Sequence, residues 1–298
     1  MARQRDEGWH AVPDQGGRRI VVTGASGGIG LETARILAEH GADVVMAVRN
    51  PAKGEQAAAA VRTSARGSVV VQRLDVSDLA SVRAFADGVG AVDVLVNNAG
   101  VLGLPLSWSV DGHELHLATN HLGHFALANL LLPRLTDRVV VVSSRSHRTG
   151  DLDLEDLRWE RRPYQPYAAY AASKLANMLF LAELQRRLTA AGSTLRVTGA
   201  HPGSTATAIT SSSGSRVKTF IGSFGHRLVG MPVAKGALPT VFAATMDVPG
   251  NTYVGPHRIH ELSGWPAGSG RSRKAIDPDL AKAAWTVSES LTGVTFPL

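Results

Sequence analysis

The sequence predicts an α/β fold built on a doubly wound parallel sheet of about seven strands, with helices on both faces. Short apolar runs alternate along the chain with segments of helical length, and this alternation is typical of βαβ crossovers. The apolar runs are continuous rather than interrupted by polar residues, as in strands that are covered by helices on both faces. A chain of 298 residues with neither an internal repeat nor a linker is expected to form a single domain.

Seven apolar runs are expected to form the strands. The first is rich in β-branched residues and leads into a glycine-rich turn, which is typical of a buried strand followed by a helix. The expected strands are residues 18–22, 44–48, 69–74, 92–96, 138–142, 195–200 and 252–254.

The segments between these runs are expected to form helices. In the first of them Ile29, Ile36 and Leu37 recur at helical spacing, and Gly41 is a natural stop. The other expected helices are residues 52–62, 79–89, 112–135, 167–190, 234–246 and 279–291. Because residues 1–17 are polar and lack periodicity, we expect a flexible N-terminal arm before a domain that spans residues 18–298.

Composition and charge exclude several classes of function. The chain has no Cys, which excludes disulfides, thiol catalysis and thiolate metal sites and agrees with a reducing compartment. Its net charge is +6, but the Arg residues are scattered, so we expect no nucleic-acid partner. The start of the chain is polar, and no apolar run approaches the length of a membrane span. We therefore expect a cytoplasmic protein with no membrane span.

A glycine-rich turn follows the first strand. Residues 23–30 place Gly24, Gly28 and Gly30 at the start of a helix. Unpaired N–H groups and the helix dipole attract phosphate there, and glycine lets a pyrophosphate approach the backbone. The spacing is G-x-x-x-G-x-G rather than the G-x-G-x-x-G of the common dinucleotide fingerprint. In the first unit of a βαβ series, this turn predicts a Rossmann-like nucleotide site.

The end of the second strand favours NADP(H) over NAD(H). The common fingerprint has an acidic residue about 20 positions beyond the turn, which binds the ribose 2′-hydroxyl. Here the chain has Arg49 and Asn50, with Lys53 close behind. A carboxylate would repel a 2′-phosphate, whereas Arg49 can pair with it. The alternative is that Arg49 is an ordinary strand-end residue in solvent.

Asp75 and Val76 follow the third strand, where the adenine edge of a dinucleotide would lie. We include both among the expected cofactor contacts. Asp78, close behind them, is as readily an ordinary helix cap.

Tyr170 and Lys174 lie four positions apart on an expected helix, so they share one face. An ammonium near a phenol favours the phenolate and lowers the pKa of the Tyr. Such a Tyr can exchange a proton with an oxygen that changes between carbonyl and alcohol. An isolated pair with this spacing is more often a surface Lys packed over a half-buried Tyr.

Five motifs occur in the same order as in the short-chain dehydrogenase/reductase (SDR) family, which the chain resembles over residues 18–290. They are Thr23–Gly30, Asn97–Gly100, Ser143-Ser144, Tyr170–Lys174 and Pro202-Gly203. The segments 120–125, 142–147, 157–164 and 170–177 look like the retinol dehydrogenase-like branch of that family.

The resemblance implies a role for each matching residue. Tyr170 would be the catalytic acid/base, and Lys174 would bind the nicotinamide ribose and lower the pKa of Tyr170. Ser144 would orient the substrate oxygen, with Ser143 as the alternative, and Asn120 would hold a relay water with its main chain. The implied cofactor contacts are Gly24, Ser26, Gly28, Ile29, Gly30, Arg49, Asn50, Lys53, Asp75, Val76, Asn97, Ala99, Gly100, Tyr170, Lys174, Pro202, Gly203, Thr205 and Thr207.

The predicted function is NADP(H)-dependent transfer of hydride to or from a carbonyl or alcohol carbon. The Ser/Gly-rich residues 208–232 carry an apolar stripe and are expected to cover the substrate, which favours a lipophilic one. His121, His124 and His147 lack metal-site spacing, so we expect no metal and interpret them as packed or pocket-rim residues. The rival hypothesis is a nucleotide-sensing or scaffold protein that has lost catalysis on the same fold. The family resemblance also implies a homodimer or homotetramer formed through residues 112–135 and 167–190.

Overall fold

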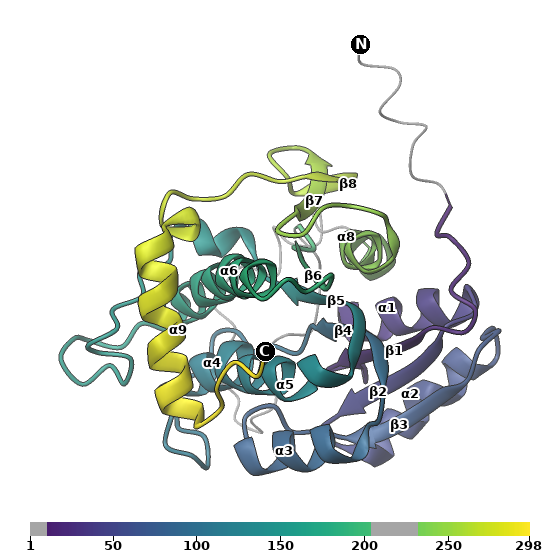
Figure 1. The fold of residues 1–298 in the computed structure, drawn as a ribbon, viewed down its shortest axis with the longest axis horizontal. Helices are drawn as coiled ribbons and strands as arrows, with labels where there is room; N and C mark the ends of the chain where they lie inside the picture. Colours follow the sequence, from purple (N-terminus) through teal and green to yellow (C-terminus); the bar gives the residue numbers. More distant parts are fainter. Residues whose placement is uncertain (1–10, 204–231) are drawn as a thin grey trace.

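The computed structural model describes residues 11–203 and 232–298, which form an eight-stranded sheet (Figure 1). The strand order is β3-β2-β1-β4-β5-β6-β7-β8; neighbours are parallel as far as β7, and β8 is antiparallel to β7. The strands are β1 (Arg19–Thr23), β2 (Asp43–Val48), β3 (Val69–Arg73), β4 (Val92–Asn97), β5 (Leu135–Val142), β6 (Arg196–Ala200), β7 (Tyr253–Arg258) and β8 (Ser263–Gly268). The predicted α/β fold is therefore confirmed, with one strand more than expected.

Helices cover both faces of this sheet, as Figure 1 shows. In β1, Ile20 and Val22 point into the core beneath α1, α2 and α8, whereas Val21 points into the core beneath α3, α5, α6 and α9. The helices are α1 (Gly28–Glu39), α2 (Pro51–Arg62), α3 (Leu79–Gly88), α4 (Leu115–Leu117), α5 (Gly123–Leu131), α6 (Pro166–Ala190), α8 (Val233–Thr245) and α9 (Pro278–Thr292). None of the helices in the described ranges is long and apolar enough to cross a membrane.

The single helix expected over residues 112–135 is divided into pieces. Gly112 has a φ of 77° and lies in a turn, and the Glu114 side chain caps the short helix α4. A π-helical turn, η1 (Ala118–Leu122), then separates α4 from α5, and a 3₁₀ turn (Leu132–Arg134) that contains Pro133 ends the segment. As a result β5 begins at Leu135, three residues earlier than expected.

The eighth strand was not predicted, because Ser263–Gly268 contains Gly, Pro and Ser but no β-branched residue. It forms by turning back along β7. Ile259, His260 and Glu261 make that turn, each with a positive φ between 49° and 64°.

Residues 11–17 belong to the N-terminal arm that we expected to be flexible, yet part of this stretch is packed. Gln15 is 1% exposed, and its N–H donates to the His40 carbonyl at 2.7 Å. Its side-chain oxygen accepts a hydrogen bond from Arg18 at 2.6 Å. Gln15 thus provides a hydrogen-bond donor for a carbonyl at the end of α1. The polarity and periodicity of the sequence do not predict this contact.

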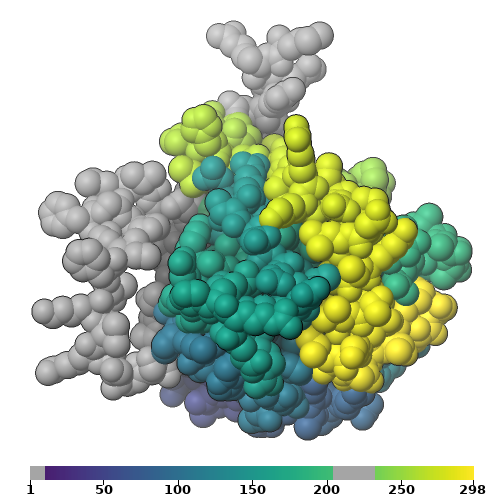
Figure 2. Space-filling view, turned by 90° about the vertical axis from the view of Figure 1, so that its left-hand side faces the viewer, coloured from purple at the N-terminus to yellow at the C-terminus, as the bar shows by residue number. Residues whose placement is uncertain are grey.

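The C-terminal helix α9 packs along α6 and also meets α5. In Figure 2 the yellow atoms of α9 lie on the surface beside the teal segments that precede them. Trp285 of α9 contacts Phe125 of α5 and stacks on Phe180 of α6, with ring centroids 4.8 and 5.9 Å apart. These two helices are the ones assigned above to a subunit interface, so α9 of the same chain covers part of them. The homodimer or homotetramer stays a prediction.

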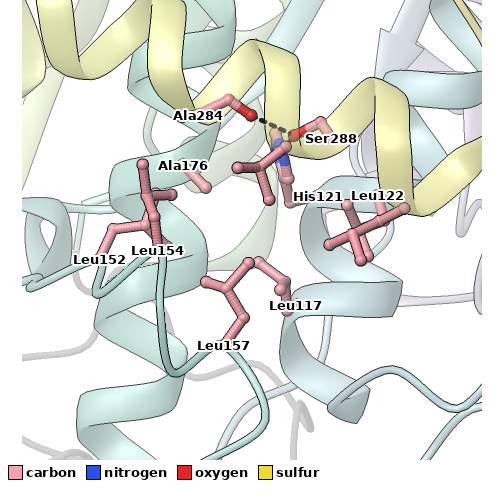
Figure 3. Close-up of a pocket in the computed structure, with 11 residues that line it drawn as sticks. Leu117, His121, Leu122, Leu152, Leu154, Leu157, Ala176, Ala284 and Ser288 are labelled. Atoms are coloured by element: carbon pink, nitrogen blue, oxygen red, sulfur yellow. Dashed lines mark hydrogen bonds between the residues drawn. The ribbon is translucent and has the colours of Figure 1, made fainter.

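A small cavity lies between α6, α9, η1 and residues 152–157 (Figure 3). His121 points toward α9, where its Nε2 lies 2.8 Å from Ser288 Oγ, and Ser288 in turn donates to the Ala284 carbonyl. The cavity has a volume of about 10 Å³. That is room for about one water molecule, so this cavity is too small for a substrate.

Candidate active site

The predicted site residues gather at the carboxyl ends of the parallel strands. The glycine-rich turn follows β1, Asn97–Gly100 ends β4, Ser144 follows β5, and Pro202 with Gly203 follows β6. Helix α6 brings Tyr170 and Lys174 to the same edge, since Ser143 Oγ donates to the Lys174 carbonyl at 2.9 Å. Ligands of open α/β sheets bind at this edge.

The Ser144 side chain lies near the Tyr170 phenol, and its Oγ donates to Ser146 Oγ at 3.2 Å. Ser143, the alternative to Ser144, instead bonds to the main chain of α6. Tyr170 is 9% exposed. Burial raises the pKa of its phenol, and the nearby Ser144 side chain offsets that rise only in part.

Lys174 is buried beside this pair. Its Nζ donates to the Val142 carbonyl at 3.1 Å and lies 5.8 Å from the centre of the Tyr170 ring. Burial lowers the pKa of Lys174 to about 8. We expected Lys174 to lower the pKa of Tyr170, whereas burial of the phenol raises that pKa in this structure.

Asn120 sits in the π-helical turn η1 and fastens the chain that leaves β4. Its side-chain oxygen accepts the Val101 N–H at 2.8 Å, and its side-chain nitrogen donates to the Val101 carbonyl and to Ser173 Oγ. Gly100 passes beside Lys174, because a Cβ at Gly100 would lie 3.6 Å from Nζ. The main-chain oxygen of Asn120 lies 3.2 Å from Nδ1 of His124. The predicted relay water at this main-chain oxygen stays a prediction.

His124 connects Asn120 to the glycine-rich turn. Its Nε2 lies 2.9 Å from Thr23 Oγ1, and that hydroxyl also accepts the N–H groups of Asn98 and Ala99 at 2.9 Å. Burial lowers the pKa of His124 to about 3, so the ring is neutral and bridges two elements of the site. We had interpreted His124 as a packed or rim residue. Its position four residues after Asn120 on one helical face was the available signal.

The glycine-rich turn has the shape that a pyrophosphate requires. Gly24 and Gly28 have positive φ values of 67° and 57°, and a Cβ at Gly30 would overlap Asn98 Nδ2 and the Gly24 carbonyl. No side chain caps the first turn of α1, so its N–H groups remain available for an anion. A Cβ at Gly27 would meet nothing within 4 Å. These features fit the phosphates of a dinucleotide.

Asn97 is the last residue of β4 and is buried. Its side-chain nitrogen donates to the His124 carbonyl at 3.4 Å, which ties the end of β4 to α5.

The expected adenosine contacts have mixed surroundings. Arg49 and Lys53 are exposed, and Asn50 caps α2 by accepting the Lys53 N–H at 3.1 Å. The Asp75 carboxylate accepts the N–H and hydroxyl groups of Ser77, so a local turn already uses one of its oxygens. Val76 is buried.

His147 fixes the end of β5. Its Nε2 accepts the Ser272 N–H at 3.3 Å, which assigns the ring proton to Nδ1. Nδ1 lies 2.6 Å from the Ser144 carbonyl, to which it donates. Burial lowers the pKa of His147, which favours this neutral form. The His that we interpreted as a packed or rim residue therefore orients the main chain of Ser144.

His201 fixes the main chain at the end of β6, as His147 does at the end of β5. Its Nδ1 accepts the Gly203 N–H at 3.2 Å, and Gly203 has a φ of 69°. Burial lowers the pKa of His201 to about 4. The sequence analysis gave His201 no role, although it directly precedes Pro202-Gly203. Thr205, Thr207 and residues 208–231 of the expected cover lie outside the described residues.

A glycine-rich turn and a Tyr–Lys–Ser group thus lie together at the carboxyl edge of a doubly wound sheet. Residues 18–218 match the family model for short chain dehydrogenase. The chain belongs to the short-chain dehydrogenase family, and within it to the retinol dehydrogenase-like group, whose members act on CH–OH or C=O groups and bind NAD(P). The prediction of the family is confirmed.

Two curated relatives bear the name retinol dehydrogenase. Human retinol dehydrogenase 12 is 48% identical over 196 residues, which cover 63% of this chain and 61% of the relative. Human retinol dehydrogenase 13 is 36% identical over 298 residues, which cover 94% of this chain and 86% of the relative. The match to retinol dehydrogenase 12 thus spans less than two thirds of that protein.

Two solved structures share the fold. A crystal structure of an uncharacterized protein from Mycobacterium Paratuberculosis is 50% identical, with a TM-score of 0.83 and coverage of 96% of this chain and 97% of that one. A short chain dehydrogenase from Burkholderia cenocepacia J2315, solved in complex with NADP, is 24% identical. Its TM-score is 0.63, and the match covers 80% of this chain and 95% of that one.

Proposed function

We propose that this protein is an NADP(H)-dependent dehydrogenase/reductase that interconverts a lipophilic carbonyl compound and its alcohol, with Tyr170 as the acid/base. The observation that carries the proposal is the buried Tyr170 phenol beside Ser144, with the buried Lys174 Nζ 5.8 Å from the centre of the Tyr170 ring. The carbonyl oxygen of a substrate would lie between the two hydroxyls, where negative charge develops during reduction.

Tyr170 Oη donates the proton to the substrate oxygen in reduction and removes it in oxidation. The bound nicotinamide would supply or accept the hydride at C4. Burial disfavours the phenolate that forms at Tyr170, so the nearby positive charge of Lys174 is needed to stabilise it. Lys174, with a pKa of about 8, can then pass a proton back toward Tyr170 through the water that Asn120 is proposed to hold.

The glycine-rich turn would hold the pyrophosphate, and Asn97 at the end of β4 remains a proposed cofactor contact. Arg49 and Lys53 are cations near the end of β2, which favours a 2′-phosphate over a free ribose hydroxyl. The structural neighbour with bound NADP supports the same choice. Asp75, Val76, Pro202 and Gly203 remain proposed contacts.

A lipophilic substrate is proposed because the relatives carry the name retinol dehydrogenase. Since the match to retinol dehydrogenase 12 covers 61% of that protein, we propose a class of substrate and not retinol itself.

The test follows absorbance of NADPH and NADH with a panel of aldehydes, ketones and alcohols. We expect turnover with NADPH. Tyr170→Phe should abolish turnover while NADPH still binds, as measured by fluorescence titration. The matched control is Tyr167→Phe, because Tyr167 lies on the same helix but is 53% exposed. Turnover retained in Tyr170→Phe would remove Tyr170 from this role, and a wild type that binds NADPH but turns over nothing would favour the scaffold hypothesis.

Cofactor preference has its own test. Arg49→Asp should shift the ratio of kcat/KM values toward NADH, because a carboxylate repels the 2′-phosphate. An unchanged ratio would mean that Arg49 is an ordinary solvent-exposed residue.

A further inference from the structure

A buried Glu–His pair lies directly behind Tyr170. Glu114 and His116 are 2% and 0% exposed, and Oε1 of Glu114 lies 2.8 Å from Nδ1 of His116. The His116 ring meets the Tyr170 ring edge-on, with centroids 6.5 Å apart and planes at 68°. The site described above uses neither residue, yet a buried carboxylate is costly unless its position matters.

The hydrogen bonds fix the state of His116. The Leu104 N–H donates to its Nε2 at 3.3 Å, so Nε2 carries no proton. Nδ1 therefore carries the proton and donates to Glu114. Burial favours the neutral form of Glu114, but the hydrogen bonds from the side chain and main chain of His116 outweigh it and lower the pKa of Glu114. The pair is a neutral His oriented by a carboxylate.

Tyr164 adds a third member from the polar stretch that follows β5. Its hydroxyl lies 2.9 Å from Oε1 of Glu114 and 3.2 Å from the Leu104 carbonyl. Burial and the negative charge of Glu114 raise the pKa of Tyr164, so it remains a hydrogen-bond donor. Trp159 packs against its ring, with centroids 5.3 Å apart.

The chain between Gly100 and Leu104 is thereby held at both ends. At one end, Asn120 binds both the N–H and the carbonyl of Val101. At the other end, His116 accepts the Leu104 N–H, and the Tyr164 hydroxyl lies near the Leu104 carbonyl. The segment starts beside Lys174 and ends beside the His116 ring that touches Tyr170. The N–H groups of Val101 and Leu104 are bound by side chains, and the side chains of Val101, Leu102 and Leu104 are apolar and half-buried.

We propose that Glu114, His116 and Tyr164 are positioning residues that hold residues 101–104 as an apolar wall of the substrate site, and that this wall selects substrates with an apolar group next to the reacting carbon. The inference rests on the proposed function and adds to it a substrate class and the residues that set it. The apolar side chains of this wall cannot replace the water that a polar substrate loses on binding, so the wall disfavours such a substrate.

Tyr164→Phe is the decisive variant, because it removes one hydroxyl and keeps the packing on Trp159. We compare kcat/KM for a long-chain aldehyde such as nonanal with that for glyceraldehyde. The nonanal preference should fall about tenfold, mainly through a higher KM for nonanal, since a hydrogen bond to a charged group is lost. The dissociation constant for NADPH should stay unchanged. Tyr167→Phe, the matched control, should keep the wild-type preference.

A His116 series separates positioning from folding. His116→Ala should lose the preference, whereas His116→Gln retains an acceptor for the Leu104 N–H and should restore part of it. If the variants melt at lower temperatures but keep the wild-type preference, the residues are merely structural and the proposal is wrong.

Hydrogen exchange at the Leu104 amide gives a readout that does not depend on turnover. Exchange in residues 101–104 should be faster in Tyr164→Phe than in wild type. Unchanged exchange would overturn the proposal even in an active enzyme. If wild type turns over none of the panel, the proposed function fails, and faster exchange in the variant would still support the positioning role.

Discussion

The two ends of the sheet bury positive charge in opposite ways. At the amino end Arg138, 2% exposed, pairs with Asp137 at 2.9 Å and donates to the Met246 carbonyl at 2.7 Å. Asp137 also pairs with Arg18 and with Arg196. At the carboxyl end Lys174, 4% exposed, forms no ion pair with any described residue and donates to the Val142 carbonyl.

The pKa values record this difference. Burial raises the pKa of Asp137, but its hydrogen bond and charge interaction with Arg138 outweigh burial and lower it. Burial lowers the pKa of Lys174 to about 8 with no carboxylate to oppose it. A charge with a full set of partners holds the strands together, whereas a buried charge without a counterion costs stability and is retained for chemistry. Lys174 is therefore the better indicator of function.

Replacing Lys174 with Met tests this contrast most strongly. Lys174→Met keeps the length of the side chain and removes its charge, so turnover should fall about 10²- to 10⁴-fold. The same change should raise the free energy of unfolding by up to about 3 kcal/mol, because the pKa of Lys174 is lowered from 10.5 to about 8. Turnover assays and denaturant titration measure the two effects.

The pH dependence supplies the control for Lys174→Met. In wild type the unfolded chain binds the Lys174 proton more tightly than the folded one, so stability should rise between about pH 8 and pH 10.5. Lys174→Met should lack that rise. If Lys174→Met is both inactive and less stable than wild type, Lys174 is a structural residue. That result would contradict the view that Lys174 costs stability and serves the reaction.

At the amino end the expectation is reversed. Asp137→Asn leaves Arg138 buried without its counterion and should cost about 3 kcal/mol of stability. Because Asp137 lies at the opposite end of the strands from Tyr170, kcat of the folded enzyme should stay within about twofold of wild type. Urea titration and active-site-normalised turnover distinguish the two effects. A large loss of kcat without a loss of stability would show that this end of the sheet also serves the reaction.

The fold was predictable wherever local pattern determines it. Continuous apolar runs marked the parallel strands, but β8, with Gly and Pro in place of β-branched residues, carried no such pattern. The break at η1 was also hidden, because it depends on the bond from Asn120 to Val101, which is distant in sequence.

The site residues were likewise predictable only where a local sequence pattern marks them. Short motifs brought Tyr170, Ser144 and Lys174 to attention, since their spacing is local. His116, His124 and His201 act through hydrogen bonds to residues on other elements or to the main chain, and a single His in a sequence does not reveal such partners.

Those buried histidines give the smallest expected effect and extend the contrast to a second residue type. Burial lowers the pKa of His121 to about 4, of His124 to about 3 and of His201 to about 4, each from an ordinary value of 6.5. Each is neutral in the folded protein and protonates on unfolding in acid. Stability is therefore complete above about pH 6.5 and should fall toward pH 4, by about 2 kcal/mol per histidine between pH 8 and pH 5.

His121→Gln tests this expectation because His121 faces α9 and lies outside the proposed catalytic group. Thermal unfolding of the variant is measured at pH 8 and at pH 5. The loss of stability between these two pH values should be about 2 kcal/mol smaller than in wild type. The exposed His260 is the matched control, and His260→Asn should keep the wild-type difference. If His121→Gln also keeps it, burial does not lower the pKa of His121 in the folded protein, and the contrast does not extend to this histidine.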